Sequence, residues 1–575
     1  MAPVRRLALA LATLATLVSC TGTGPATPTP APVVKAAPKQ PAPPAVPATS
    51  KPDPPLAPPA PTGEFVVAGP GGRSEQASTP PVRRIQYAKL DKKWATRVGK
   101  TTFRTTMAHT DGLLVIGTHG ATLEGKNEGT DGVYLLDART GAKTRMIATP
   151  GSGDRDVGGV AIDGSTVFFT TDNSKIVAAT LAGQVVWTAE GGGKVRPAPA
   201  LADLDGDGAV DVVVGDESAT LRALHGGTGK PLWTVKTGEN EYEARGYIAA
   251  AAIADLDGDG KDDVVAAARD GILTAYRGKS GEVMWQHPGN SGVHASPTIA
   301  DFDGDGAPEV LAAWSYGDLS VHDGKTGAVR WGTVLSQDGA GIEGLFGTPT
   351  PLPGKPGVLV APTSWWENDD GVILVGVDAR VFRSFENRVS SSAVVLDLDD
   401  DGRHEAILGT EKGLLLAFTA DGGRAELGRF SGGIEAPALI ADVDTDGKYE
   451  LLVASNDGML TCLATAATGK PYVSRFRGDS LHNRGDLGKT ALGWQTGQAG
   501  GDPSPKPGTG IRVDYLRCCQ DLTEQATRAP SPDNSKLLQA AAKCNSLAAI
   551  AMERSGALVS IGEAAAGAPL PSACR

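Results

Sequence analysis

One acidic phrase recurs through the middle of the chain, and its spacing restricts the fold more than any other feature. Its first copy, from Asp203 to Asp211, reads DLDGDGAVD and is followed at once by the apolar run Val212-Val213-Val214. Later copies begin at Asp255, Asp301, Asp397 and Asp442, at steps of 52, 46, 96 and 45 residues. Because 96 is two steps of 48, a degenerate copy is expected between the third and fourth, and residues 348–361 supply it. A period of this length indicates one supersecondary unit per copy, stacked on its neighbours.

Each unit predicts four short strands and no helix. In the first acidic copy, strands are expected over 198–202, 211–215, 219–224 and 231–235, with the acidic loop between the first two. Residues 113–141 and 160–187 follow the same rhythm without an acidic loop. We therefore expect an all-β fold over residues 88–490, a seven- or eight-bladed β-propeller of four-stranded blades. Counting the repeat units gives eight blades, with seven as the close alternative.

A glycine followed four residues later by tryptophan marks the last strand of several units. The pairs are Gly183/Trp187, Gly229/Trp233, Gly281/Trp285 and Gly327/Trp331. One large ring per unit can wedge between adjacent blades and bury area that an isolated blade would expose. Residues 92–98 carry Trp94 in the same style, so we expect them to close the ring against a final blade that ends near Phe476. Closure would remove sheet edges that otherwise invite aggregation.

The acidic loops have the composition of cation sites. Each has carboxylates at positions 1, 3, 5 and 9, a glycine at position 6 and a free main-chain carbonyl at position 7, and oxygen ligands in this number suit calcium. A helical EF-hand would need Glu at position 12, where these loops have only apolar strand residues. Thr445 replaces the usual glycine in the last loop, a change that should leave the ligands in place. The alternative is a set of hydrated acidic turns without metal.

Up to five calcium ions are expected. The proposed ligands are Asp203, Asp205, Asp207 and Asp211; Asp255, Asp257, Asp259 and Asp263; Asp301, Asp303, Asp305 and Glu309; Asp397, Asp399, Asp401 and Glu405; and Asp442, Asp444, Asp446 and Glu450.

The loop pattern resembles the FG-GAP or VCBS calcium loops of integrin alpha-type propellers. Two further phrases, Asp137 to Gly141 and Thr326 to Trp331, resemble the repeats of quinoprotein-like (PQQ-like) propellers. Both resemblances imply a propeller fold. They imply different functions, because the first family binds partners whereas the second includes quinone-dependent dehydrogenases.

The first 63 residues indicate export and anchoring. Arg5 and Arg6 precede a short apolar run, so residues 1–19 are interpreted as a signal peptide. Cys20 after small residues resembles the lipobox of bacterial lipoproteins, which implies acylation, with palmitate among the chains, and a membrane anchor at Cys20. Residues 20–63 are rich in Pro and Ala and are expected to form a disordered tether. The alternative is a plain secretory peptide.

The C-terminal segment is expected to be a separate element. Residues 491–510 have the composition of a linker, and 511–575 are expected to form a small α-helical hairpin with helices over 515–527 and 535–552. Disulfides are expected to staple it, with the pairing left open, among Cys518, Cys519, Cys544 and Cys574. A metal site is the alternative there. Cys462, among apolar residues, is expected to be a buried free thiol.

Composition and the placement of the histidines argue against several classes of function. A net charge of −12 argues against a nucleic-acid partner, and none of the eight histidines belongs to a zinc-protease pattern or adjoins a plausible nucleophile. We therefore expect a non-catalytic, calcium-binding lipoprotein of the bacterial cell envelope, at the outer membrane and either surface-exposed or periplasm-facing. Its propeller would bind a protein or polysaccharide in adhesion or as a scaffold. The alternatives are a PQQ-dependent quinoprotein dehydrogenase and a periplasm-facing scaffold for outer-membrane assembly.

Overall fold

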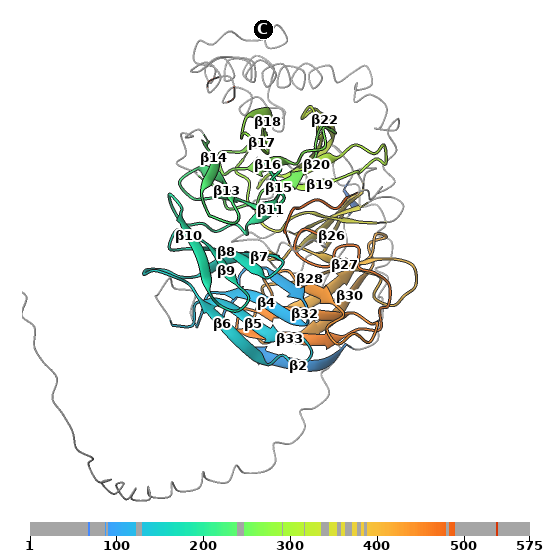
Figure 1. The fold of residues 1–575 in the computed structure, drawn as a ribbon. Coiled ribbons are helices and arrows are strands. Elements are labelled where there is room, and N and C mark those ends of the chain that lie inside the picture. The colour runs from blue at the N-terminus through green and yellow to red at the C-terminus, as the bar shows by residue number, and fades with distance from the viewer. Residues whose placement is uncertain are drawn as a thin grey trace, which may run out of the picture. The chain divides into compact units, whose positions relative to one another are not determined.

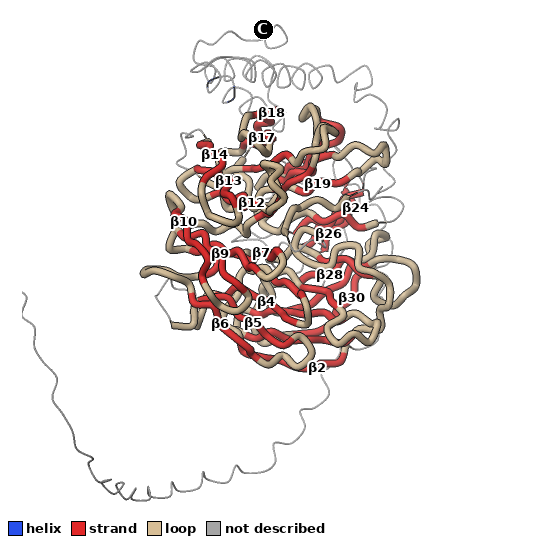
Figure 2. The backbone as a smooth tube through the Cα atoms, in the orientation of Figure 1, coloured by secondary structure: helices blue, strands red, loops and turns tan. Residues whose placement is uncertain are grey.

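The computed structural model contains eight antiparallel sheets among the residues that it describes, seven of four strands and one of five. Those residues are 67–68, 87, 90–121, 129–237, 246–289, 291–315, 317–334, 344–353, 358–362, 371–376, 381–384, 388–478, 482–488, 536 and 538. The sheets follow one another along the chain as the blades of a propeller (Figure 1). Outside positions 536 and 538, the described chain consists of strands, turns and loops (Figure 2).

Seven blades take consecutive strands, innermost first. Blades one to four comprise β3 (Met107–Thr110), β4 (Leu113–Thr118), β5 (Gly132–Asp137) and β6 (Lys143–Ala148); β7 (Val157–Asp163), β8 (Thr166–Thr171), β9 (Lys175–Thr180) and β10 (Val185–Glu190); β11 (Ala200–Ala202), β12 (Asp211–Gly215), β13 (Thr220–His225) and β14 (Pro231–Lys236); and β15 (Ala252–Ala254), β16 (Asp263–Ala267), β17 (Ile272–Arg277) and β18 (Val283–Pro288). Blades five to seven comprise β19 (Thr298–Ala300), β20 (Glu309–Ala313), β21 (Asp318–Asp323) and β22 (Val329–Val334); β23 (Thr350–Leu352), β24 (Val358–Pro362), β25 (Val372–Gly376) and β26 (Val381–Ser384); and β27 (Val394–Leu396), β28 (Glu405–Gly409), β29 (Leu414–Phe418) and β30 (Arg424–Arg429).

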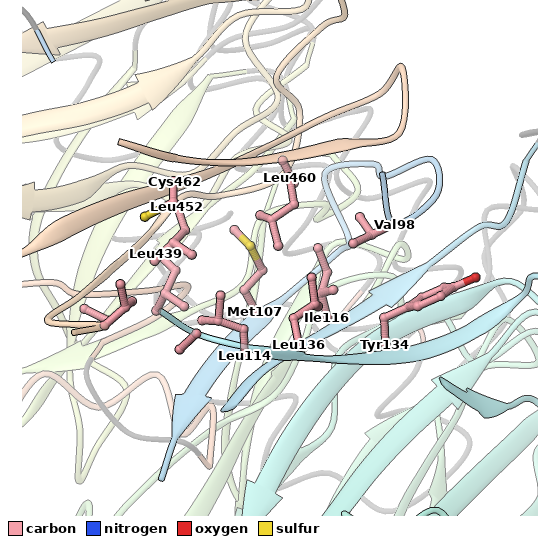
Figure 3. Packing of buried hydrophobic residues seen from close by; sticks show 14 of the residues in the cluster. Val98, Met107, Leu114, Ile116, Tyr134, Leu136, Leu439, Leu452, Leu460 and Cys462 are labelled. Atoms are coloured by element: carbon pink, nitrogen blue, oxygen red, sulfur yellow. The ribbon is translucent and has the colours of Figure 1, made fainter. Parts of the chain in front are cut away.

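The eighth blade joins the two ends of the repeat array. It consists of β31 (Leu439–Ala441), β32 (Glu450–Ser455) and β33 (Met459–Ala464), completed by β2 (Asp91–Arg97), which pairs antiparallel with β33. The expected closure by residues 92–98 is therefore confirmed, and β2 lies beside β33 in Figure 1. Apolar side chains of blades one and eight share a core, in which Met107 and Ile116 from one blade lie near Leu439 and Leu460 from the other (Figure 3).

The predicted degenerate copy at 348–361 is also confirmed, since it forms β23 and β24 of the sixth blade. This blade has a fifth strand, β1 (Val67–Ala68), paired antiparallel with β26. One expectation needs correction. The last blade ends at β33 rather than near Phe476, and residues 472–478 and 482–488 take another course, given below.

Tryptophan joins neighbouring blades, as the sequence predicted, and a glycine of the next blade receives it. The indole N–H groups of Trp187, Trp233 and Trp285 donate to main-chain carbonyls of the following blade at 2.6, 2.6 and 2.7 Å. Each ring lies against the Gly of the following Gly-x-x-x-Trp phrase; Trp233, for instance, packs on Gly281. The three contacts therefore link four blades, two to five, in series, because Gly229 and Gly281 each receive one ring and their phrases supply the next.

The terminal segments are described only in small part. Lys536 and Leu538, inside the predicted 535–552 helix, are helical. Cys20, the tether, the linker and the cysteines of the C-terminal hairpin lie outside the described residues. Cys462 is a buried free thiol, as expected. Within the part of the chain that is described, no helix is both long enough and apolar enough to cross a membrane.

Replacing Gly281 by Ala tests the tryptophan contact. Gly281 has φ +72°, and an added Cβ would lie 2.8 Å from the Trp233 ring, whereas Gly112 has φ +73° and open space around it. Gly112→Ala should therefore cost only the left-handed backbone penalty of about 1–2 kcal/mol. Gly281→Ala should lose about 1–3 kcal/mol more, because the ring must move. Urea unfolding of both variants measures the difference, and equal destabilisation would contradict the contact.

Candidate functional site

The five acidic loops all connect the innermost strand of a blade to its second strand, and they fold in the same way. In the first loop, the carboxylate of Asp203 accepts the N–H groups of Gly206, Asp207 and Gly208 at 2.8, 3.1 and 2.9 Å. The carboxylate at position 9, Asp211, accepts the N–H of Leu204 at 3.0 Å. The loop is thus wound around its own first and last acids.

The fifth loop keeps this arrangement despite its missing glycine. Thr445 adopts a positive φ of 60°, and Asp442 still accepts the N–H groups of Asp446 and Gly447, both at 3.1 Å. The prediction that Thr445 leaves the loop intact is therefore confirmed for these contacts. The acid at position 5 forms a hydrogen bond within its own loop: Asp207, for example, accepts the N–H of Ala209 at 2.8 Å.

Carboxylates converge within the loops. In four of them, three acids each place an oxygen within 4.8 Å of the others. These groups are Asp203, Asp205 and Asp211; Asp255, Asp257 and Asp259; Asp301, Asp303 and Glu309; and Asp397, Asp399 and Glu405. In the first, third and fourth loops the acids that come together are those at positions 1, 3 and 9, and in the second loop they are those at positions 1, 3 and 5.

In two loops a basic side chain from another strand lies close to the acids at positions 3 and 9. Arg277 Nη1 lies 2.6 Å from Asp257 and 3.8 Å from Asp263 in the second loop. Lys93 Nζ lies 2.6 Å from Asp444 and 2.7 Å from Glu450 in the fifth. The hydrogen bonds from these cations hold the pKa values of Asp257 and Asp444 below the usual range. In both loops, protein cations therefore supply charge that a metal ion would otherwise supply.

The third and fourth loops are different. Burial raises the pKa of Glu309 to about 7 and that of Glu405 to about 7, with neighbouring aspartates adding to the shift. No basic side chain in the described part of the chain forms an ion pair with Asp301, Asp303 or Glu309. In the fourth loop Arg403 pairs with Asp401, at position 5. In both loops the acids at positions 1, 3 and 9 thus have no basic ion-pair partner among the described residues, so they fit a divalent cation better than those of the second and fifth loops do.

The first loop also fits a cation, on a separate observation. Asp211 is fully buried, and its Oδ1 has no hydrogen-bond partner. Burial raises the pKa of Asp211. A buried carboxylate oxygen without a donor is costly unless an ion or proton satisfies it. His225 Nε2, at 2.9 Å from Asp207, contacts only the outer acid of this loop.

The feature that the sequence did not reveal is the course of residues 472–478 and 482–488, here called the channel segment. Its main chain exchanges hydrogen bonds with the innermost strands of several blades: with Val395 of β27, Ile440 of β31, Leu201 of β11, Ile253 of β15 and Ile299 of β19, at 2.7 to 3.2 Å. Asn483 Nδ2 reaches Val160 of β7 as well, at 2.7 Å. A segment that touches the inner strands of six blades lies on the axis of the ring, so the chain fills its own central channel.

Polar side chains fix the channel segment. Asn483 is fully buried; its amide donates to the carbonyls of Val160 and Pro199, and its Oδ1 accepts from Arg475 Nη2 at 2.9 Å. The segment lies at the acidic-loop end of the channel, because the N–H of Asp301 donates to Gly488 at 3.3 Å.

Another acidic group lies away from these loops and was not predicted. Asp154, Asp156 and Asp172 come close together, but Lys194 lies 2.7 Å from Asp154 and 3.0 Å from Asp172. Arg104 lies 3.1 Å from Asp172. This group is a salt-bridge network between blades one, two and three. Its members come from separate loops, so no local motif in the sequence marks it.

Comparison with known proteins supports the repeat type. Residues 129–304 match a family model, PQQ_2, described as outer membrane protein assembly factor BamB. No curated protein sequence gives a match. The central part of the chain therefore consists of repeats similar to those of PQQ-like propellers.

Solved structures show distant likeness. The alignment with BamB from Moraxella catarrhalis has 17% identity and a TM-score of 0.47, covering 65% of this chain and 99% of that chain. Sqt1 from Saccharomyces cerevisiae aligns at 11% identity and a TM-score of 0.49, over 66% and 100%. Quinohemoprotein alcohol dehydrogenase from Comamonas testosteroni aligns at 15% identity and a TM-score of 0.44, over 67% and 78%.

Asn483→Ala tests the anchoring of the channel segment. It removes two buried amide bonds and the acceptor of Arg475, so we expect a loss of about 3 kcal/mol of unfolding free energy. Asn173 is the matched control, since its Nδ2 also donates to two carbonyls, at 2.9 and 3.2 Å, but at a more exposed site. Asn173→Ala should cost about 1 kcal/mol. Equal losses in urea unfolding would contradict the anchoring role.

Proposed function

We propose that this protein is a non-catalytic scaffold of the bacterial cell envelope that binds a protein partner through propeller loops stabilised by calcium. One observation carries the proposal: the chain occupies its central channel with its own residues 472–478 and 482–488. Partners would therefore bind at the loops and blade edges.

The filled channel weighs against the enzymatic alternative. A quinone with one axial calcium needs open space at the ring axis, whereas here main-chain bonds from Val473 and Gly485 reach inner strands of blades seven and five. The candidate calcium loops are also distributed around the ring instead of at its axis. Both features favour a binding function over a dehydrogenase.

The family match favours assembly over adhesion. The matched model describes an outer membrane assembly factor, and the match covers complete blades two to four. We therefore propose a protein ligand and a periplasm-facing position at the outer membrane, with Cys20 as the lipid anchor. A polysaccharide ligand at the cell surface is the second candidate, from the resemblance of the acidic loops to adhesion propellers.

Calcium would stabilise the scaffold at selected loops. In the first, third and fourth loops three acids lie together, and no described Arg or Lys forms an ion pair with the acids at positions 1, 3 and 9; Arg403 of the fourth loop pairs with Asp401, at position 5. Asp203, Asp301 and Asp397 with their loop partners would therefore hold the ions. In the second and fifth loops, Arg277 and Lys93 would compete with an ion. Calcium would neutralise the clustered carboxylates and fix the loop that precedes the second strand of each blade.

Calcium should therefore raise the melting temperature of the chelated protein, because an ion that binds only the folded state stabilises it by mass action. Asp303→Asn, in the third loop, should reduce this calcium-induced rise. Asp257→Asn, at the same position of the second loop, should leave the rise nearly unchanged, since Arg277 already pairs with that loop. Scanning calorimetry with and without chelator measures both. A wild-type melting temperature indifferent to chelator would refute the calcium proposal.

The partner can be sought directly. Purified full-length protein, immobilised with calcium or with chelator, should retain an outer-membrane protein from envelope extracts, more strongly with calcium. Addition of pyrroloquinoline quinone should give no bound chromophore. Stoichiometric quinone binding with dye-linked alcohol oxidation would overturn the scaffold proposal, and retention of polysaccharide alone would favour the second candidate.

A further inference from the structure

The pairing of the outermost strand distinguishes blade six from the other seven blades. In those seven, the pairing of the third strand with the outermost strand shifts in register, which marks a β-bulge. In blade two, for example, the shift lies between Val185 and Trp187. In blade six, β25 and β26 pair in regular register from Val372 to Val375. Within the described strands, β26 is therefore the one outermost strand without a bulge.

A bulge protects the edge of a sheet. It bends and twists the strand, so the row of N–H and C=O groups along that edge no longer matches an added strand. Some of the seven bulged strands carry other protective residues as well: β2 contains Lys92 and Lys93, and β14 begins at Pro231. The edge of blade six lacks the bulge, so it is the edge of the ring best suited to receive another strand.

The structure shows that this edge does receive a strand. β1 pairs antiparallel with β26, and Val67 lies opposite Phe382. The second pair is Ala68 with Val381. β1 comes from outside the repeat array, and the sequence around it, Phe65 to Ala68, is uncharged and rich in residues typical of strands. β1 faces two of the four residues of β26, and no other described strand pairs along that edge, so the edge is longer than its occupant.

We propose that the edge of blade six is a strand-addition site, at which an extended, uncharged segment of a partner polypeptide pairs with β26 and displaces β1. The existence of a protein partner rests on the scaffold function proposed above. The observed occupant indicates the chemistry of the segment, because β1 is extended, apolar and uncharged. A segment that pairs with all of Val381–Ser384 would form more main-chain hydrogen bonds than β1 forms, and this gain would offset the intramolecular advantage of β1.

In the absence of a partner, β1 would keep the edge covered. A regular edge without a paired strand invites association between copies of the same chain. A short strand from the same chain prevents this association and still leaves the edge to a longer segment, because it contributes only two residue pairs. The site would therefore be closed in the free protein and open to a partner.

Peptide binding to the full chain, measured by fluorescence anisotropy, tests the site. The labelled probe has the sequence of residues 62–70, and the control peptide has proline in place of Val66 and Val67, which removes two N–H donors. The probe should bind, and the control peptide should not. In the double variant Val67→Pro/Ala68→Pro, β1 cannot pair, so the probe should bind about tenfold more tightly, as expected if β1 covers the edge about nine-tenths of the time. Thr62→Pro is the matched control and should bind like the wild type.

A disulfide can lock β1 in place. Ala68→Cys combined with Val381→Cys puts two cysteines on directly opposite residues, whose Cα separation in an antiparallel pair lies within the range that a disulfide spans. The oxidised variant should lose probe binding, and its reduced form, the matched control for folding, should regain it. Oxidised wild type controls for the native cysteines. Retained binding in the oxidised variant, with the bond verified by mass spectrometry, or no binding by the wild type and the proline variant, would overturn the proposal.

The locked variant also separates this proposal from the scaffold function. Retention of a protein from envelope extracts should fall about tenfold or more on oxidation and recover on reduction. If both forms retain the same protein equally, the scaffold function stands and the strand-addition site is wrong. If no envelope protein is retained while the probe binds and the lock abolishes its binding, the edge is confirmed and the scaffold function is wrong. A wild-type dimer that the locked variant does not form, without probe binding, would assign the edge to a second copy and overturn the proposal.

Discussion

Closure of the ring is the constraint on which the rest of the structure depends. Adjacent blades share apolar cores, and the core between blades eight and one combines residues from near both ends of the repeat array, such as Val98 and Leu452. Without β2 on the edge of β33, this core would lack its outer strand and blade eight would expose an unpaired edge. A blade alone would expose both of its apolar faces, so the eight blades stabilise one another only as a closed set.

The closing strand also determines the charge of one acidic loop. Lys93 lies in β2, and its Nζ contacts Asp444 and Glu450, more than 350 positions away, at 2.6 and 2.7 Å. Formation of the last sheet therefore places a cation inside the fifth loop. In each of the other loops the acids lie within one blade, so their positions do not involve the closing strand. In the fifth loop, the strand that closes the ring therefore also supplies the cation beside the acids. In the third loop, ring closure and the charge of the loop are independent.

The repeat architecture was predictable because local sequence patterns that recur in each blade determine it. Strand lengths, the step of about 48 residues and the Gly-x-x-x-Trp spacing each depend on neighbours within one blade or the next, and they correctly gave eight blades and closure by residues 92–98. The convergence of Asp301, Asp303 and Glu309 followed in the same way from positions within a single loop.

Features made by distant segments were not predictable. The channel segment lacks the alternation of apolar and polar residues that marks a strand. Main-chain hydrogen bonds to the inner strands of distant blades hold it, so no periodic pattern in its sequence predicts where it lies. Likewise Arg277 reaches the second loop because β17 pairs with β16 and sets Arg277 opposite Asp263. The motif alone made five loops appear equivalent, whereas the register of neighbouring strands makes them different.

The channel segment and the acidic loops are physically coupled, and the coupling explains why opposite charges gather at this end of the ring. Asp400, in the fourth loop, accepts the N–H of Thr468 at 3.0 Å just before the segment begins, and Asp301 of the third loop donates to Gly488 at its end. Between these points Arg484 pairs with Asp262, which adjoins the second loop. Each of the two loops that contact the ends of the segment brings three carboxylates together, and no described Arg or Lys forms an ion pair with those three. An ion that ordered these loops would therefore hold the channel segment at both ends, and the stability of the axis would depend on the loops around it.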